Sequence, residues 1–481
     1  MNFLGREGSF RQLEQLWDKK AASLVAITGR RRIGKSRLVQ EFSKTAKTWI
    51  EIQGLAPSEG NSNELQLKHF MDQLSAQLSI PGLKAESWYQ AFWLLDQQIP
   101  STGKVLVFLD ELSWMGKYDP AFPGTLKTCW DTLFKKHDRL ILVVCGSVSS
   151  WIQANVIHAT DFLGRLSLTL NLEELPLSVL PKFWGRYQAD TSPREMAQIL
   201  SVTGGVPRYL EEVNFSKSAE QNIKRLCFER NGILVEEFDR IFKDIFEEKH
   251  LTYKKIVSQL VHGKKSFAQI CKALKTDRNG TFSKYLDELT LAGFLSRDFN
   301  YQNGKPTKLS YYRIKDNYLR FYLRYIEPQK DKINKNLFQN KNILLLPEWN
   351  TIMGLQFENL VLNNLPLLLK KLEIDPGIIL SAAPYFQTKT QKNKGSCQID
   401  LLIETKDQIF YLCEIKTGKK IGKEAVEEIQ RKASLLKRPK YSSLRKVLIF
   451  LGELEPSLVE SEGFYQIIGF EELTGTPREL G

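Results

Sequence analysis

One eight-residue stretch constrains the fold more than any other feature of this chain. Residues 29–36 read GRRRIGKS, which fits the pattern G-x-x-x-x-G-K-[ST]. The largely apolar residues 23–28 predict a short buried strand, and apolar residues at helical spacing in 35–44 predict a helix. Gly29 and Gly34 permit the sharp backbone turns that this junction requires. We therefore expect an α/β fold in which a parallel strand leads through a glycine-rich turn into a helix.

The same loop is suited to binding phosphate groups. Its backbone N–H groups would surround the phosphates, and the helix N-terminus adds a partial positive charge. Lys35 would reach the β- and γ-phosphates, and the Ser36 hydroxyl would hold Mg²⁺. The pattern therefore predicts ATP and Mg²⁺ as ligands. The predicted nucleotide-binding residues of the loop are Gly29, Arg30, Arg31, Arg32, Ile33, Gly34, Lys35, Ser36 and Arg37.

A second motif has the composition of a metal-binding strand end. Residues 105–109 read VLVFL, and such a run is typical of a parallel strand that is covered on both faces. Asp110 and Glu111 follow at its carboxyl end, where ligands bind in open α/β sheets. Asp110 would bind Mg²⁺, and Glu111 would polarise the water that attacks ATP. The alternative is an ordinary strand end with two solvated acids.

Two later residues are candidates for sensing the γ-phosphate. Ser147 follows the apolar strand predicted at 140–145, and its hydroxyl could orient water. Arg165 follows Gly164 and could act as a finger or sensor, either within one chain or across two copies in a homo-oligomer. A structural salt bridge is the alternative for Arg165.

A helical lid is expected after the sheet. Residues 173–187 and 192–202 are expected to be helical, and Arg208 lies in the turn GGVPRYL, where it could contact the nucleotide; a surface arginine in an interhelical turn is the alternative. Together with residues 3–7 (FLGRE), these motifs resemble the archaeal-type ATPases of the AAA+/STAND class. The resemblance implies a P-loop NTPase core, a parallel sheet with a helical lid, over residues 1–230.

The pattern changes to short elements in residues 250–315. Three short helices and a hairpin resemble a winged helix, whose third helix would enter the DNA major groove. The alternative is a winged helix that packs within the molecule. Residues 328–341, which are polar and lysine-rich, are expected to form a flexible crossing to the last domain. The helices are expected at 253–261, 266–274 and 280–291, and the strands at 295–298 and 309–314. The residues expected to face DNA are Arg278, Ser283, Lys284, Lys305 and Lys308.

A second group of acids is predicted in residues 346–475. Two strands are joined by an odd-length loop, which places Asp400 opposite Glu414, and Lys416 lies on the same face. A cluster of two acids and a lysine is costly unless it holds a cation or solvent. A helix at 353–362 carries a further acid, Glu358. The two strands are expected at 398–404 and 408–416.

This arrangement resembles the PD-(D/E)xK nucleases, which have a restriction-endonuclease-like α/β fold. The resemblance rests on Asp400, on Glu414 and Lys416, on Glu358 and on Gln430 of the next helix. It implies that Glu358, Asp400 and Glu414 hold Mg²⁺ and that Lys416 assists the attacking water. Ile399 departs from the pattern, because proline often precedes the acid. The alternatives are an inactive binding domain and a charged surface hairpin.

Composition narrows the class of partner. The chain has 68 Lys and Arg against 55 Asp and Glu, a net charge of +13, which favours DNA or another polyanion. A basic surface kept for solubility is the alternative. The six cysteines form no C-x-x-C pair and are expected to be buried reduced thiols. We see no signal peptide and no apolar run of transmembrane length, so we expect a cytoplasmic protein.

These observations lead to one main hypothesis and two alternatives. The main hypothesis is a Mg²⁺-dependent ATPase that couples ATP hydrolysis to DNA binding or remodelling. The first alternative is an ATP-gated, metal-dependent DNA endonuclease that cuts with Asp400, Glu414 and Lys416. The second is a nucleotide switch without turnover that signals through protein partners.

Overall fold

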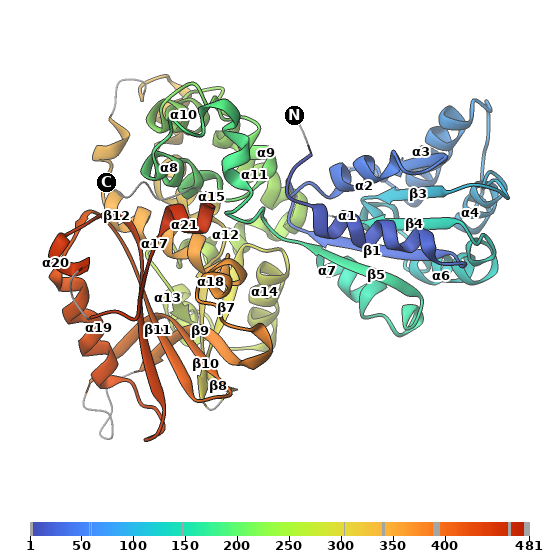
Figure 1. Ribbon diagram of the computed structural model, residues 1–481. Helices are drawn as coiled ribbons and strands as arrows, with labels where there is room; N and C mark the ends of the chain where they lie inside the picture. Colours follow the sequence, from blue (N-terminus) through green and yellow to red (C-terminus); the bar gives the residue numbers. More distant parts are fainter. Residues whose placement is uncertain are drawn as a thin grey trace. The chain divides into compact units, whose positions relative to one another are not determined.

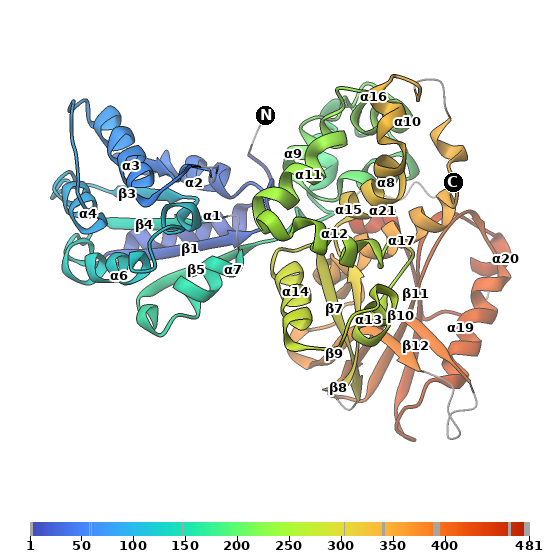
Figure 2. The ribbon, with the colours of Figure 1, turned by 180° about the vertical axis from the view of Figure 1, so that it is seen from behind.

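The computed structural model describes residues 3–56, 58, 60–146, 149–302, 304–338, 342–387, 395–459 and 463–475. The chain divides into two compact units, Met1–Leu175 and Pro176–Gly481. Figures 1 and 2 show the elements of each unit from two opposite sides. Each unit has its own sheet structure and its own hydrophobic core.

The first unit is built on a five-stranded sheet in which every neighbouring pair of strands is parallel. The strand order is β2-β3-β4-β1-β5, so β4 lies between β1 and β3. Strands β1, β3 and β4 are buried along their whole lengths, as their continuous apolar runs predict. The strands are β1 (Ser23–Gly29), β2 (Thr48–Gln53), β3 (Val105–Asp110), β4 (Leu140–Cys145) and β5 (Leu166–Leu172).

Helices cover both faces of this sheet (Figure 1). Alternate strand residues such as Leu24 and Val107 share one core cluster with residues of α3, α4 and α6. Helix α2 contacts β1, β3 and β4. The helices are α1 (Glu7–Glu14), α2 (Lys35–Ser43), α3 (Asn63–Leu78), α4 (Trp88–Asp96), α5 (Leu112–Met115), α6 (Phe122–Thr132) and α7 (Ser149–Ile152).

The prediction of a helix over 173–187 is wrong. This stretch instead contains two short 3-10 turns, Leu180–Phe183 and Gly185–Tyr187. Pro176 and Pro181 lack the backbone N–H that a continuous helix would use, which explains the interruption. The edge strand β5, which precedes this stretch, was not predicted.

The second unit contains a group of helices followed by a small antiparallel sheet. The predicted helix 192–202 is confirmed as α8, and Ser192 caps it by accepting from the backbone N–H of Glu195. The helices are α8 (Pro193–Thr203), α9 (Pro207–Leu210), α10 (Ala219–Cys227) and α11 (Ile233–Phe246).

The short helices and the hairpin predicted within 250–315 are present. The sheet order is β6-β8-β7, and both strand pairs are antiparallel. Strand β6 was not predicted; it adds a short third strand beside β8. The elements are α12 (His250–Ser258), β6 (Lys265–Ser266), α13 (Phe267–Leu274), α14 (Gly280–Leu291), β7 (Leu295–Gln302) and β8 (Lys305–Ile314).

A mixed five-stranded sheet forms the last part of the chain. Strands β9, β10 and β11 pair antiparallel, whereas β11, β12 and β13 pair parallel. The register of β10 and β11 pairs Leu401 with Cys413, and Asp400 and Glu414 directly follow this last pair. Their pairing stays a prediction. The elements are α17 (Trp349–Leu362), α18 (Leu365–Lys371), β9 (Ile379–Gln387), β10 (Cys397–Thr405), β11 (Ile409–Ile421), α19 (Lys423–Leu435), β12 (Ser443–Leu454), α20 (Pro456–Val459), β13 (Gln466–Gly469) and α21 (Phe470–Thr474).

A buried polar network joins the small sheet to this last part. Arg313 of β8 pairs with Asp298 of β7 at 2.9 Å. Its Nη1 also donates to Oδ1 of Asn359 in α17 at 2.6 Å. Gln356 of α17 donates to the Asn317 carbonyl oxygen at 2.6 Å and is fully buried. Because buried polar groups must find partners, this network fixes the two parts against each other.

The lysine-rich stretch 328–341 is more ordered than predicted. It contains the short helix α16 (Lys330–Asn334), in which Ile333 is buried. Lys330 contacts Glu236 and Asp239 of α11 at 2.8 and 2.6 Å. Residues 339–341 lie outside the described residues. Helix α16 is therefore packed against the unit and does not act as a free linker.

Candidate functional site

The glycine-rich loop follows β1 with the backbone geometry that its sequence predicts. Gly29 has φ 143° and Gly34 has φ 91°, both of which glycine adopts readily. A Cβ atom on Gly29 would lie 2.5 Å from the carbonyl oxygen of Leu172 in β5. Gly29 is therefore required by close packing as well as by its backbone angle.

The two predicted ATPase motifs meet at this loop. Lys35 is buried, and its Nζ donates to the carbonyl oxygens of Gly29 and Arg30 at 2.9 and 3.2 Å. The Ser36 hydroxyl donates to Oδ2 of Asp110 at 2.7 Å. Asp110 also accepts from the backbone N–H of Glu111 at 3.0 Å. Hydroxyl and carboxylate oxygens are the donors that Mg²⁺ prefers, so Ser36 and Asp110 fit this ion.

Glu111 adopts a backbone conformation that is uncommon for residues other than glycine. Its φ is 53°, in the left-handed region, and the side chain is partly exposed at the end of β3. Backbone strain of this kind persists where the surroundings hold it, and it is concentrated at functional sites. Gly54, at the end of β2, donates to the Asp110 carbonyl oxygen at 2.9 Å and supports this turn.

An arginine near the start of the chain holds the glycine-rich loop through hydrogen bonds to backbone carbonyl oxygens. The Nη2 atom of Arg6 donates to the carbonyl oxygens of Ile33 at 3.0 Å and Glu173 at 2.7 Å. Burial lowers the pKa of Arg6 to about 10. Beside it, Arg30 pairs with Glu174 at 3.5 Å. The sequence did not predict that Arg6 holds the loop in this way.

The predicted phosphate sensors have other partners or fall outside the description. Arg165 makes two 2.8 Å contacts with Asp131 of α6, which is the salt bridge weighed as its alternative. Hydrogen bonding to Asp131 raises the pKa of Arg165. Arg208 pairs with Glu212 at 2.7 Å. Ser147 lies outside the described residues. A phosphate contact by any of these side chains stays a prediction.

The acids predicted in the second unit line one cavity of about 730 Å³. Oδ2 of Asp400 accepts from the backbone N–H of Ile415 at 2.9 Å. Lys416 lies 2.9 Å from Oε1 of Glu414. Glu358 of α17 also lines the cavity, where Lys264 pairs with it at 3.3 Å. The hairpin register and the helix acid therefore converge as the sequence predicts.

Sequence reasoning missed two residues of this cavity and named a wrong neighbour. Lys432 of α19 binds both carboxylate oxygens of Glu414, at 2.8 and 2.6 Å. Glu428 of the same helix pairs with Lys416 at 3.0 Å. Gln430, which was predicted to join the site, is exposed and does not line the cavity. The i, i+4 spacing of Glu428 and Lys432 was the available signal, because these positions share one helix face.

The cavity strongly perturbs its ionisable groups. Burial and the charges of Glu414 and Glu358 raise the pKa of Asp400 to about 7. Burial is the largest single influence on Lys416 and acts to lower its pKa, but the charges and hydrogen bonds of Glu414 and Glu428 together outweigh burial and raise the pKa. In the arrangement of the described residues, no group of three or more His, Cys, Asp or Glu could hold a metal ion.

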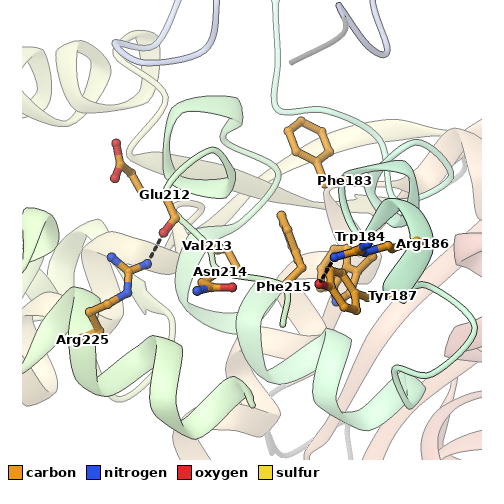
Figure 3. Close-up of a pocket in the computed structure, with 9 residues that line it drawn as sticks. All are labelled: Phe183, Trp184, Arg186, Tyr187, Glu212, Val213, Asn214, Phe215 and Arg225. Atoms are coloured by element: carbon orange, nitrogen blue, oxygen red, sulfur yellow. Dashed lines mark hydrogen bonds between the residues drawn. The ribbon is translucent and has the colours of Figure 1, made fainter. Parts of the chain in front are cut away.

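A further pocket of about 670 Å³ lies among the helices that begin the second unit (Figure 3). Trp184 and Phe215 form its aromatic wall, with ring centroids 4.8 Å apart. Arg225 donates to the Glu212 carbonyl oxygen at its edge. None of the residues predicted to act on a ligand lines this pocket.

Two whole-chain expectations can be compared with the structure. All six cysteines are buried and form no disulfide, as predicted. Among the described helices, none combines the length and the apolar character needed to cross a bilayer.

Comparison with known proteins supports the prediction of an ATPase domain in the N-terminal part of the chain. Residues 3–213 match a family of ATPase domains found predominantly in Archaea. The chain is also 26% identical over 358 residues to an uncharacterized protein of Methanocaldococcus jannaschii. This alignment covers 74% of this chain and 75% of the relative. The predicted archaeal-type ATPase domain is confirmed at this level.

Two solved structures illustrate the structural likeness. The Walker-type ATPase PABY2304 of Pyrococcus abyssi superposes with a TM-score of 0.48 at 17% sequence identity. The superposition covers 67% of this chain and 96% of the P. abyssi chain. The ORC2 protein of Aeropyrum pernix, in ADPNP-ADP complexes, has a TM-score of 0.41 at 15% identity and covers 70% of this chain and 97% of its own.

Proposed function

We propose that this protein binds ATP and hydrolyses it with Mg²⁺, and that the second unit couples this reaction to DNA. The observation that carries the proposal is the 2.7 Å contact between Ser36 and Asp110, which joins the loop to the acidic strand end. The sequence positions of these residues are far apart, and the sheet brings their oxygens together where one ion could bind both.

The residues of the loop have distinct roles in this proposal. Lys35, which donates to the Gly29 and Arg30 carbonyls, would turn its ammonium toward the β- and γ-phosphates. Ser36 and Asp110 would hold Mg²⁺, which neutralises developing charge on the phosphates. Glu111 would orient the attacking water from its constrained position at the strand end.

Exposed cations of the second unit support a DNA partner. Arg278 is exposed just before α14, Lys284 is exposed in its first turns, and Lys305 and Lys308 are exposed on the β7–β8 hairpin. These are the positions at which a winged helix would contact a major groove and flanking phosphates. The +13 net charge favours the same class of partner.

Part of the hairpin is engaged with the mixed sheet. The backbone N–H of Gly304 donates to Oε2 of Glu404 at 3.2 Å, and Tyr311 packs on Phe386 with centroids 4.2 Å apart. This packing is the alternative role weighed for a winged helix. Lys284 of α14 and Arg278, two residues before the helix, remain exposed, so we expect this end of α14 to supply most DNA contacts.

The proposal is tested by the rate of ATP hydrolysis with and without double-stranded DNA, with Lys35→Ala as the blank. We expect turnover that DNA stimulates and that disappears in the blank. Lack of stoichiometric ATP binding would contradict the ATPase assignment. Bound ATP without turnover would favour the nucleotide switch, whose partner is a protein.

The endonuclease alternative has one supporting observation, because Asp400, Glu414 and Lys416 line the same cavity. The contacts of Glu414 with Lys432 oppose it, since a metal-dependent nuclease needs these oxygens for its ion. We therefore do not assign DNA cleavage to this chain.

A further inference from the structure

The acid cluster of the second unit is engaged by the protein's own cations. Both oxygens of Glu414 contact the Lys432 ammonium, at 2.8 and 2.6 Å. Oε1 of Glu414 also contacts Lys416 at 2.9 Å. A hard divalent ion such as Mg²⁺ requires several converging oxygens. Both carboxylate oxygens of Glu414, the central acid of the predicted site, therefore already contact lysine ammonium groups.

The other two predicted ligands are engaged as well. Oδ2 of Asp400 accepts from the backbone N–H of Ile415 at 2.9 Å, and Oε1 of Glu358 pairs with Lys264 at 3.3 Å. Each of the three acids therefore has a donor from the chain itself. This donor set does not fit the ion that the nuclease resemblance implies.

Burial makes the central ion pair hard to replace. The side chains of Glu414 and Lys432 are only 1% and 6% exposed. A divalent ion at Glu414 would have to displace the ammonium, which would leave a buried charge without its partner, a costly arrangement. It would also lie close to Lys416, and repulsion between cations is strong where water is excluded.

The four charges around the pair are already balanced. Lys416 and Lys432 together contact Glu414 and Glu428, two ammonium groups against two carboxylates. The i, i+4 spacing of Glu428 and Lys432 on α19 fixes this arrangement from the helix side, at 3.3 Å. No further positive charge is needed for neutrality among these four groups.

We propose that Lys432 takes the place of a divalent ion in this cluster, so that the second unit excludes such ions until Lys432 is removed. The ammonium of Lys432 is a built-in cation that holds Glu414 against α19. This inference concerns the second unit and does not depend on ATP hydrolysis in the first.

The inference is tested by Mn²⁺ binding to the full chain without nucleotide, followed by the electron paramagnetic resonance signal of free Mn²⁺. Lys432→Met keeps the aliphatic stem and removes the charge, and Lys423→Met is the matched control at an exposed lysine of the same helix. Asp400→Asn, alone and combined with Lys432→Met, identifies binding at this cluster. Ser36 and Asp110 are unchanged in every variant, so their contribution cancels.

We expect wild type, Lys423→Met and Asp400→Asn to bind the same amount of Mn²⁺. Lys432→Met should gain one site per chain, and the double variant should lose it. A wild-type site that disappears in Asp400→Asn would overturn the inference, and this comparison stands even if Lys432→Met does not fold. A folded Lys432→Met variant without the additional site would also overturn it.

Discussion

Gly54 offers a test of whether Glu111 acts in ATP hydrolysis. A Cβ atom at Gly54 would lie 2.6 Å from the Glu111 carbonyl oxygen and 3.1 Å from Cβ of Trp114. The first of these contacts involves backbone, which cannot rotate away as a flexible side chain can. Gly54→Ala should therefore displace Glu111 while leaving Lys35 and Ser36 in place.

The size of the effect follows from this geometry. Ordinary contact with a Cβ atom starts near 3.4 Å, so the Glu111 backbone must retreat by about 0.8 Å. A displacement near 1 Å at a reacting group can reduce the rate about 100-fold, so we expect a loss of about 50-fold in kcat. This loss corresponds to about 2.3 kcal/mol in activation free energy.

The assay is steady-state ATP hydrolysis together with equilibrium ATP binding. Gly54→Ala should lower kcat but keep the ATP affinity within about twofold of wild type, because the phosphate loop that binds ATP is unchanged. Gly124→Ala is the matched control, since a Cβ at Gly124 in α6 would meet nothing within 4 Å. A Gly54→Ala enzyme with wild-type kcat would refute the placement of Glu111 in the reaction.

Three further perturbations test other parts of the structure. Arg6→Met removes the hydrogen bonds to the Ile33 and Glu173 carbonyl oxygens. It should weaken ATP binding about 30-fold in a fluorescent-nucleotide titration, since each of the two bonds contributes about 1 kcal/mol; unchanged affinity would contradict the bracing role. Gln356→Leu removes the hydrogen bonds that the buried amide donates to the Asn317 and Ser201 carbonyl oxygens, and it should lower the free energy of unfolding by about 3 kcal/mol in denaturant titrations; the control Gln430→Leu, at an exposed position, should have little effect. Asp400→Asn tests the raised pKa of Asp400, which is about 7. The stability that Asp400 contributes is fully present below its ordinary pKa of 3.8 and is lost as pH rises through 7. The melting temperature of the variant, measured in EDTA, should therefore rise relative to that of wild type between pH 5 and pH 8. A difference that does not change with pH would contradict the raised pKa.

The parts of this molecule that sequence reasoning predicts are those fixed by local geometry. The phosphate loop is predictable because its glycines, strand and helix are contiguous, and the backbone allows few alternatives. The placement of Asp400 and Glu414 at the same end of the hairpin is predictable because the strand period of two and the loop length fix which residues share a face. Both conclusions need only residues that are near in sequence.

The parts that were missed depend on distant contacts. Arg6 reaches Ile33 and Glu173, and nothing in a local pattern indicates that an arginine near the start of the chain is buried there. Strand β5 is an edge strand with mixed burial, so the apolar pattern of its sequence is a weak signal for a strand. It is recognised only from its pairing with β1 in the folded sheet. The prediction of a helix over 173–187 was wrong for a local reason. It relied on the spacing of apolar residues and gave too little weight to two prolines, which interrupt the hydrogen bonding of a helix.

The second unit shows how one helix decides the chemistry of a predicted site. Acids and a lysine on one strand face indicate either a metal centre or a neutralised cluster, and the strands alone do not distinguish them. The distinction comes from α19, where Glu428 and Lys432 would normally be read as an exposed i, i+4 pair. The helix instead turns Lys432 inward onto Glu414, where the ion pair is almost completely buried. Because a buried carboxylate requires a charged partner, the rotation of this helix determines whether that partner is an ammonium or a metal ion.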